Sequence, residues 1–98
     1  MVQTGIELGA IVSCSPAAVA TDVNGEFVLM NLERDRCYEL GATGSDIWRR
    51  LAAPVRVSDL LAQLNDAYDA APGTIEADLL RTLAELHAEG LLLIHPNE

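Results

Sequence analysis

Two cysteines and two histidines are the side chains in this sequence whose types most often serve as metal ligands or nucleophiles. Cys14 and Cys37 lie in the first half of the chain, and His87 and His95 lie near its carboxyl end. A metal site needs ligands clustered at short spacings, and a cysteine nucleophile needs a base beside it. This arrangement has neither feature, so we predict reduced thiols, no metal, no cofactor and no enzyme activity.

The charge of the chain restricts the partners that it can bind. Its 98 residues include 15 acidic side chains and six basic ones, which gives a formal net charge of −9. Such a chain repels phosphate groups, so we expect it to bind neither nucleic acid nor an anionic membrane, whereas a basic or neutral peptide is permitted. The sequence has no signal-peptide pattern and no apolar run of membrane-spanning length, and we predict a cytoplasmic protein.

The main chain offers more chemistry than the side chains do, because the sequence predicts an unpaired strand edge. Asn24-Gly25 separates two strand-like runs, and this dipeptide favours the positive φ angles of a two-residue hairpin turn. After a charged connection, residues 36–40 alternate with the period of a third strand. Since helices follow directly, one side of this strand keeps free N–H and C=O groups unless the chain returns to pair with it. The pattern leaves open which residues carry the free groups.

Three helices are expected to cover one face of this sheet. Apolar residues at spacings of three and four predict them at about 43–51, 57–68 and 74–89, with Thr43, Ser58 and Thr74 as amino-terminal caps. Residues 10–14 and 91–94 are apolar enough for short extended segments. The pattern predicts a single α+β domain over residues 1–98, with its core at about 15–94. The expected fold is winged-helix-turn-helix-like, a three-stranded antiparallel sheet followed by three helices.

Several stretches in this order resemble proteins of the PqqD-like family. Residues 19–22 and 26–32 resemble the family's opening hairpin, and residues 36–40, followed by Gly44 and Ile47-Trp48, resemble its strand-to-helix segment. Residues 57–68 and 75–92 continue the match, which extends from about Ser15 to Leu92. Gly41 and Arg56 depart from the family's pattern near the expected starts of the first two helices.

The resemblance implies that the chain is a RiPP recognition element, a small module that binds the leader of a ribosomally made precursor peptide. In that family the leader adds as a strand to the third strand and lies against the third helix. The module then presents the precursor to a separate enzyme, which is a leader peptidase in lasso-peptide pathways. The expected peptide-binding residues are Arg36, Cys37, Tyr38, Glu39, Leu40, Asp78, Leu79, Thr82 and Leu86.

Other functions stay open from the sequence alone, although a lasso-peptide pathway is favoured. The same family includes peptide chaperones of pyrroloquinoline quinone synthesis, which serve a radical enzyme. A free strand edge also permits a self-associating structural subunit, such as a homodimer. A winged-helix DNA-binding protein is disfavoured, because the third helix carries one arginine among several acidic residues.

Overall fold

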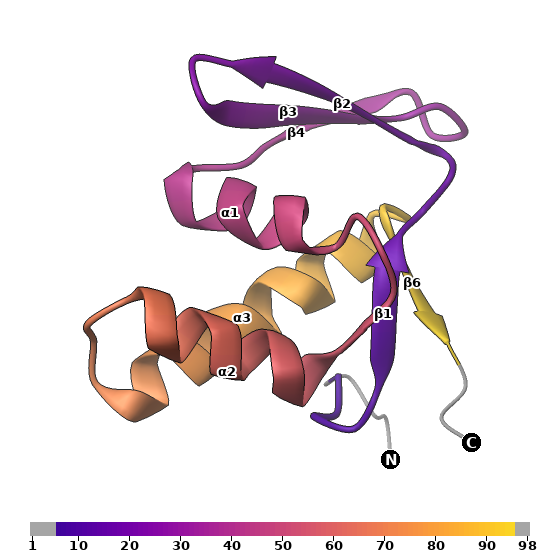
Figure 1. Cartoon of the computed structure of the whole chain (residues 1–98). Helices are drawn as coiled ribbons and strands as arrows, with labels where there is room; N and C mark the ends of the chain where they lie inside the picture. The colour runs from indigo at the N-terminus through magenta and orange to yellow at the C-terminus, as the bar shows by residue number, and fades with distance from the viewer. Residues whose placement is uncertain (1–5, 96–98) are drawn as a thin grey trace.

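The computed structural model describes residues 6–95, which form two small antiparallel sheets and three helices (Figure 1). The elements are β1 Ile11–Cys14, β2 Ala18–Val23, β3 Glu26–Asn31, β4 Arg36–Glu39, α1 Ala42–Arg50, β5 Val55–Arg56, α2 Val57–Ala67, α3 Pro72–Ala88 and β6 Leu92–His95. The first predicted sheet is present with strand order β2-β3-β4, and the α+β fold is confirmed. The segments expected only to be extended, β1 and β6, pair with each other, and β1 also pairs with β5, in a second sheet that the sequence did not predict.

The hairpin between β2 and β3 follows the predicted turn. Asn24 and Gly25 have φ angles of 56° and 88°, as a type I′ turn requires. Val23 pairs with Glu26 directly across the turn, and the Asp22 carboxylate accepts a hydrogen bond of 2.8 Å from the Gly25 N–H. The turn therefore fixes the register between β2 and β3, because each later pair of these two strands counts from it.

One hydrophobic core joins the sheets and helices. One face of the β2-β3-β4 sheet lies toward α1 (Figure 1). This face carries Leu29, which has no exposed area and belongs to the same core cluster as Ile47 and Trp48 of α1. Its buried neighbours in the core come from every helix and from the second sheet, and include Val12, Ile47, Trp48, Leu51, Leu60, Leu64, Leu79, Leu83, Leu86 and Leu91. A chain of this length can bury only a modest core, and leucines supply more of its residues than any other type.

The predicted helix caps were wrong at all three helices. The helices are preceded by Gly41, Arg56 and Ala71, and none of these residues makes a side-chain cap. At α2 the backbone takes this role, because Val57 N–H donates to Ala10 C=O at 2.8 Å and Ser58 N–H donates to Leu8 C=O at 2.9 Å. Helix α3 begins two residues earlier than expected at Pro72, which has no N–H to satisfy in the first turn.

The loop between β3 and β4 is fastened to the carboxyl end of α3. Asn31, which is 2% exposed, donates from its side-chain nitrogen to the Glu89 carbonyl at 2.8 Å. Arg34 donates to the Ala88 carbonyl at 2.7 Å. These bonds satisfy carbonyls that the helix end leaves without partners. They also hold β4 beside α3, and this placement creates the surface described next.

Candidate functional site

Strand β4 lies at an edge of its sheet, as predicted. The strand order is β2-β3-β4, and within residues 6–95 no strand other than β3 pairs with β4. After β4 the chain turns directly into α1. One side of the β4 backbone therefore keeps N–H and C=O groups that another extended chain can bond.

The hydrogen bonds of the sheet identify which residues of β4 face the free edge. Leu40 N–H donates to Phe27 C=O at 2.9 Å, at the end of the β3–β4 ladder. Alternate residues of an antiparallel strand turn their backbone groups to opposite neighbours. Tyr38, two residues before Leu40, therefore bonds β3 as well. Cys37 and Glu39 direct their N–H and C=O groups outward, toward the free edge.

Ser45, in α1, closes the ladder at this end. The Phe27 N–H donates to the Ser45 hydroxyl at 2.8 Å, and that hydroxyl donates to the Leu40 carbonyl at 3.3 Å. Ser45 has no exposed area. Its hydroxyl supplies a hydrogen-bond partner to both backbone groups, as buried polar groups require. The serine thereby fixes α1 to the end of the free strand. Sequence reasoning missed it, because a lone serine in a helix carries no pattern.

A groove of about 330 Å³ runs between the β4 edge, the start of α1 and the middle of α3. Five residues predicted for peptide binding line it, namely Tyr38, Glu39, Leu40, Asp78 and Thr82. Five further lining residues were not predicted, namely Gly41, Thr43, Gly44, Arg81 and Glu85. Asp78 and Thr82 thus lie on the flank of α3 that faces β4, while Leu83 points into the core with no exposed area.

The remaining predicted residues lie outside the groove. Leu79 and Leu86 have no exposed area and belong to the core, although Leu79 also borders a neighbouring pocket. Cys37 is an exposed thiol on the opposite face of the sheet from Tyr38. Arg36 is exposed and forms an ion pair of 3.5 Å with Glu89. Such a surface pair adds little stability.

Acidic groups dominate the charge of the groove. Glu39, Asp78 and Glu85 line it together with one basic residue, Arg81. The Arg81 guanidinium is already paired with the Asp78 carboxylate at 3.0 Å. The groove therefore favours a ligand segment that is neutral or basic over one that is acidic.

Tyr38 connects the free strand to α3 across the groove. Its hydroxyl donates to Glu85 Oε1 at 2.6 Å. Burial, this hydrogen bond and the negative charge of Glu85 together raise the pKa of Tyr38 to about 12. Each of these causes favours the neutral phenol, which is the form that can donate to the carboxylate. The bond helps to set the width of the groove.

The contribution of Tyr38 to stability is expected to disappear at high pH. The pKa in the folded protein is about 12 against an ordinary 10.0, so the stabilisation is complete below pH 10 and is lost as pH rises toward 12. An absorbance titration of the tyrosines should contain a transition near pH 12 that the Tyr38→Phe variant lacks. A transition that survives in Tyr38→Phe, and vanishes instead in Tyr68→Phe, would contradict this assignment.

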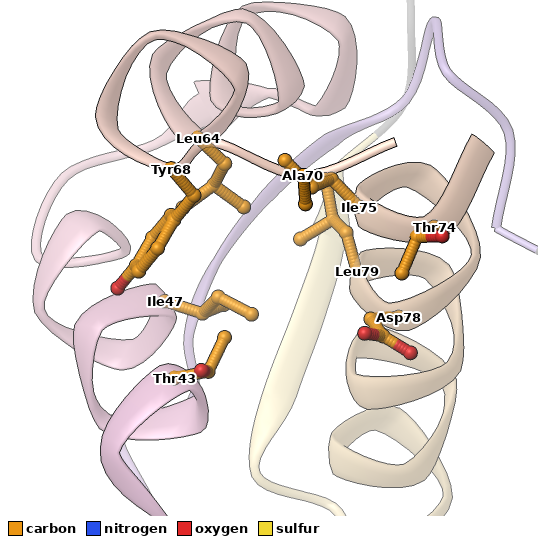
Figure 2. Close-up of a pocket in the computed structure, with 9 residues that line it drawn as sticks. All are labelled: Thr43, Ile47, Leu64, Tyr68, Ala70, Thr74, Ile75, Asp78 and Leu79. Carbon is orange, nitrogen blue, oxygen red and sulfur yellow. The ribbon is translucent and has the colours of Figure 1, made fainter. Parts of the chain in front are cut away.

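An apolar pocket of about 130 Å³ adjoins the groove, between α1, the end of α2 and the start of α3 (Figure 2). Ile47, Leu64, Ile75 and Leu79 line its interior, and Thr43 and Asp78 belong to both the pocket and the groove. Figure 2 shows these side chains converging from α1, α2 and α3. A peptide in the groove can therefore place one apolar side chain in the pocket.

Tyr68 forms one wall of this pocket and is held there by a carboxylate of α1. Its hydroxyl donates to Asp46 Oδ2 at 2.7 Å. Arg50 bonds the same carboxylate at 3.1 and 3.3 Å. Burial alone would raise the pKa of Asp46, but the hydrogen bonds from Tyr68 and Arg50 outweigh it and lower the pKa. Asp46 therefore stays ionised and keeps the wall in place.

Residues 6–95 contain no group of three His, Cys, Asp or Glu side chains placed to hold a metal ion. Both cysteines are free, and burial raises the pKa of the Cys14 thiol. In the same part of the chain, no helix has the length and apolar character needed to cross a membrane.

Comparison with solved structures finds the same fold in two complexes. The structure of TbiB1 in complex with the TbiA(β) leader peptide has a TM-score of 0.73 and 29% sequence identity, over 82% of this chain and 93% of that chain. A lasso peptide synthetase B1 complexed with the leader peptide has a TM-score of 0.67 and 18% identity, over 84% and 96% of the two chains. The second likeness shows the fold alone.

Comparison with protein families supports the resemblance predicted from the sequence. No curated protein matches the chain. The model of the family described as coenzyme PQQ synthesis protein D (PqqD) matches residues 26–92, from the start of β3 into β6. This match spans more than half of the chain and includes β4, the groove and all three helices. The chain belongs to the PqqD family.

Proposed function

We propose that this protein is a RiPP recognition element, which binds the leader of a ribosomally made precursor peptide by strand addition to β4. The observation that carries the proposal is the free edge of Cys37 and Glu39 beside the groove between β4 and α3. The likeness to TbiB1, which was solved with a leader peptide, supports a leader as the ligand and favours a lasso-peptide pathway. In this proposal the chain has no catalytic role.

The main chain accounts for only part of the affinity that such a complex needs. Cys37 and Glu39 offer four backbone groups, and four hydrogen bonds at about 0.5–1.5 kcal/mol each contribute about 2–6 kcal/mol. A micromolar complex requires roughly 8 kcal/mol, and ordering the peptide adds a further cost. Side chains of the leader must therefore supply the remainder, and they also supply the specificity.

The groove and the pocket provide places for those side chains. Alternate side chains of an added strand face the same side of the sheet as Tyr38, and so enter the groove. One apolar side chain then fills the pocket behind Thr43, and a neutral or basic one lies opposite Asp78. The bound precursor is presented to a separate leader peptidase or modifying enzyme in the cytoplasm.

Blocking the entrance of the pocket is expected to weaken leader binding without unfolding the protein. Thr43 is exposed and is the second residue of α1, so Thr43→Phe places a ring over the pocket at little cost to the core. Calorimetric titration with leader peptides of candidate precursors should give a Kd at least about tenfold weaker than that of the unmodified protein, a loss of roughly 1.4 kcal/mol.

Ser58→Phe is the matched control, because Ser58 is exposed and is the second residue of α2, away from the groove. It should bind the leader as the unmodified protein does. Equal binding by Thr43→Phe and Ser58→Phe would remove the pocket from the proposal. If the unmodified protein bound no leader from any candidate precursor, the proposed function itself would be wrong.

A second candidate is a peptide chaperone of pyrroloquinoline quinone synthesis. The description of the matching family favours it, and the same edge and groove would serve it. The two candidates differ in the leader that binds. Tight binding of a quinone-cofactor precursor, with no binding of lasso-peptide leaders, would establish the second candidate in place of the first.

A further inference from the structure

The outer face of the β2-β3-β4 sheet, which points away from α1, shares only Glu39 with the proposed groove. Residues that are paired across the three strands point to the same face of the sheet. The outer face therefore carries eight side chains, which are Val19, Thr21 and Val23 from β2, Glu26, Val28 and Met30 from β3, and Cys37 and Glu39 from β4. In Figure 1, α1 lies on the other side of the sheet, and no described helix covers this one.

This outer face is unusually apolar for a sheet surface in contact with water. Val19, Val23 and Met30 are 45%, 50% and 39% exposed, and the Cys37 thiol beside Met30 is exposed as well. The open side of an antiparallel sheet normally alternates to polar residues. A contiguous apolar patch on a small domain is typical of a surface that another protein covers.

The charged residues of the outer face indicate the chemistry of that protein. Two of its eight side chains are acidic, Glu26 and Glu39, and none is basic. A second copy of this chain would bring the same two glutamates and another formal charge of −9. Like charges disfavour such a pairing, whereas an apolar surface bordered by basic side chains is complementary to this face.

We propose that the outer face is the docking surface for the enzyme that cleaves or modifies the bound precursor. That enzyme presents an apolar patch with basic side chains opposite Glu26 and Glu39. The inference rests on the proposed function, because only a module that binds the precursor has an enzyme to receive it. It goes beyond that function by assigning the enzyme a surface that the leader itself does not occupy.

The position of β4 connects the two surfaces. A leader added at Cys37 and Glu39 becomes the fourth strand of the sheet, and every second one of its side chains continues the outer face. An enzyme on that face therefore contacts the leader as well as the module. It should bind the leader-loaded module more tightly than the empty one, and this coupling would release the module after the leader is removed.

The test compares Val19→Arg with the matched control Ile94→Arg. Val19 lies on β2, two strands from the leader edge, and Ile94 is similarly exposed at 41% but lies on β6 in the other sheet. The probe is the purified enzyme that processes the same precursor. Two quantities are measured, the affinity of this enzyme for the leader-loaded module and the rate at which it processes the precursor. Val19→Arg should weaken both by about tenfold or more, because it removes an apolar contact and repels a basic surface. Ile94→Arg should change neither.

Leader affinity and melting temperature are measured for the same variants, so that each outcome is decisive. If Val19→Arg folds poorly, Val23→Arg at the tip of the hairpin replaces it. Unchanged enzyme binding by a variant that still binds the leader would overturn this inference and leave the proposed function intact. A dimer of the unmodified protein that Val19→Arg dissociates would identify a second copy as the occupant and overturn it too. Failure of the unmodified protein to bind any leader would overturn both.

Discussion

Proline at Tyr38 is expected to destabilise the sheet, whereas proline at the preceding residue, Cys37, should leave the fold intact and strongly weaken leader binding. Both substitutions remove a backbone N–H. The Tyr38 N–H bonds Leu29 within the sheet, and the Tyr38 hydroxyl bonds Glu85 at 2.6 Å. Losing both bonds should cost about 2–4 kcal/mol, a large part of the 5–15 kcal/mol typical of a small domain.

The Cys37 N–H points to the free edge instead, where a bound leader would accept its hydrogen bond. Cys37→Pro should therefore unfold at nearly the denaturant concentration of the unmodified protein. Its leader affinity should fall at least about tenfold, because one main-chain bond is lost and the ring clashes with the incoming strand. Unfolding can be followed by the fluorescence of Trp48, which lies in the core, and binding by calorimetry.

Alanine variants separate the effect of the backbone from that of the side chain. Cys37→Ala should bind the leader normally, and Tyr38→Ala should lose only the part of stability that comes from the phenol. If Cys37→Pro binds the leader at full affinity, β4 is not the docking edge. If instead Tyr38→Pro is stable and Cys37→Pro unfolds, the assignment of free and bonded residues in β4 is reversed.

That assignment shows where sequence reasoning reaches its limit in this protein. The Asn24-Gly25 turn and the edge position of the third strand were predictable, because both depend on residues close together in the chain. The direction of each β4 backbone group depends on the register after the loop at 32–35, in which Asp35 adopts a positive φ of 55°. If the pairing of β4 with β3 shifted by one residue, the residues that bond β3 and the residues that face the free edge would exchange roles. The register is fixed by Phe27, Leu40 and Ser45, which come together only in the folded chain.

The second sheet and part of the site escaped prediction for a similar reason. Strands β1 and β6 lie at opposite ends of the described chain, and neither carries a local signal that specifies the other as its partner. On α3, helical periodicity correctly placed Asp78 and Thr82 on the flank of the apolar stripe. The same periodicity puts Leu86 on the apolar stripe, where it is wholly buried. It could not show whether that stripe also reaches the peptide-binding surface, because exposure depends on which elements pack against the helix.

Alanine at Gly90 is expected to destabilise the protein and weaken leader binding together. Gly90 has a φ of +75°, and a Cβ there would lie 2.6 Å from the Asn31 side-chain nitrogen and 3.3 Å from the Arg34 guanidinium. Asn31 cannot move cheaply, because it donates to Glu89 C=O and accepts from Glu33 N–H, both at 2.8 Å. The left-handed backbone costs about 1–2 kcal/mol for alanine, and a broken buried hydrogen bond costs about 1–3 kcal/mol more.

Leader binding should fall as well, because Asn31 and Arg34 hold the start of β4 against the end of α3 and so set the shape of the groove. Gly73→Ala is the matched control, since Gly73 lies in α3 where a Cβ meets nothing within 4 Å and φ is not positive. Its stability should stay the same or rise by a few tenths of a kcal/mol.

A double-mutant cycle with Asn31→Ala tests whether the cost at Gly90 acts through this contact. In the Asn31→Ala background the clash with the amide is absent, so Gly90→Ala should cost only the backbone term of about 1–2 kcal/mol. An equal cost in both backgrounds, measured by denaturant unfolding, would mean that Asn31 is not what the new methyl group strikes.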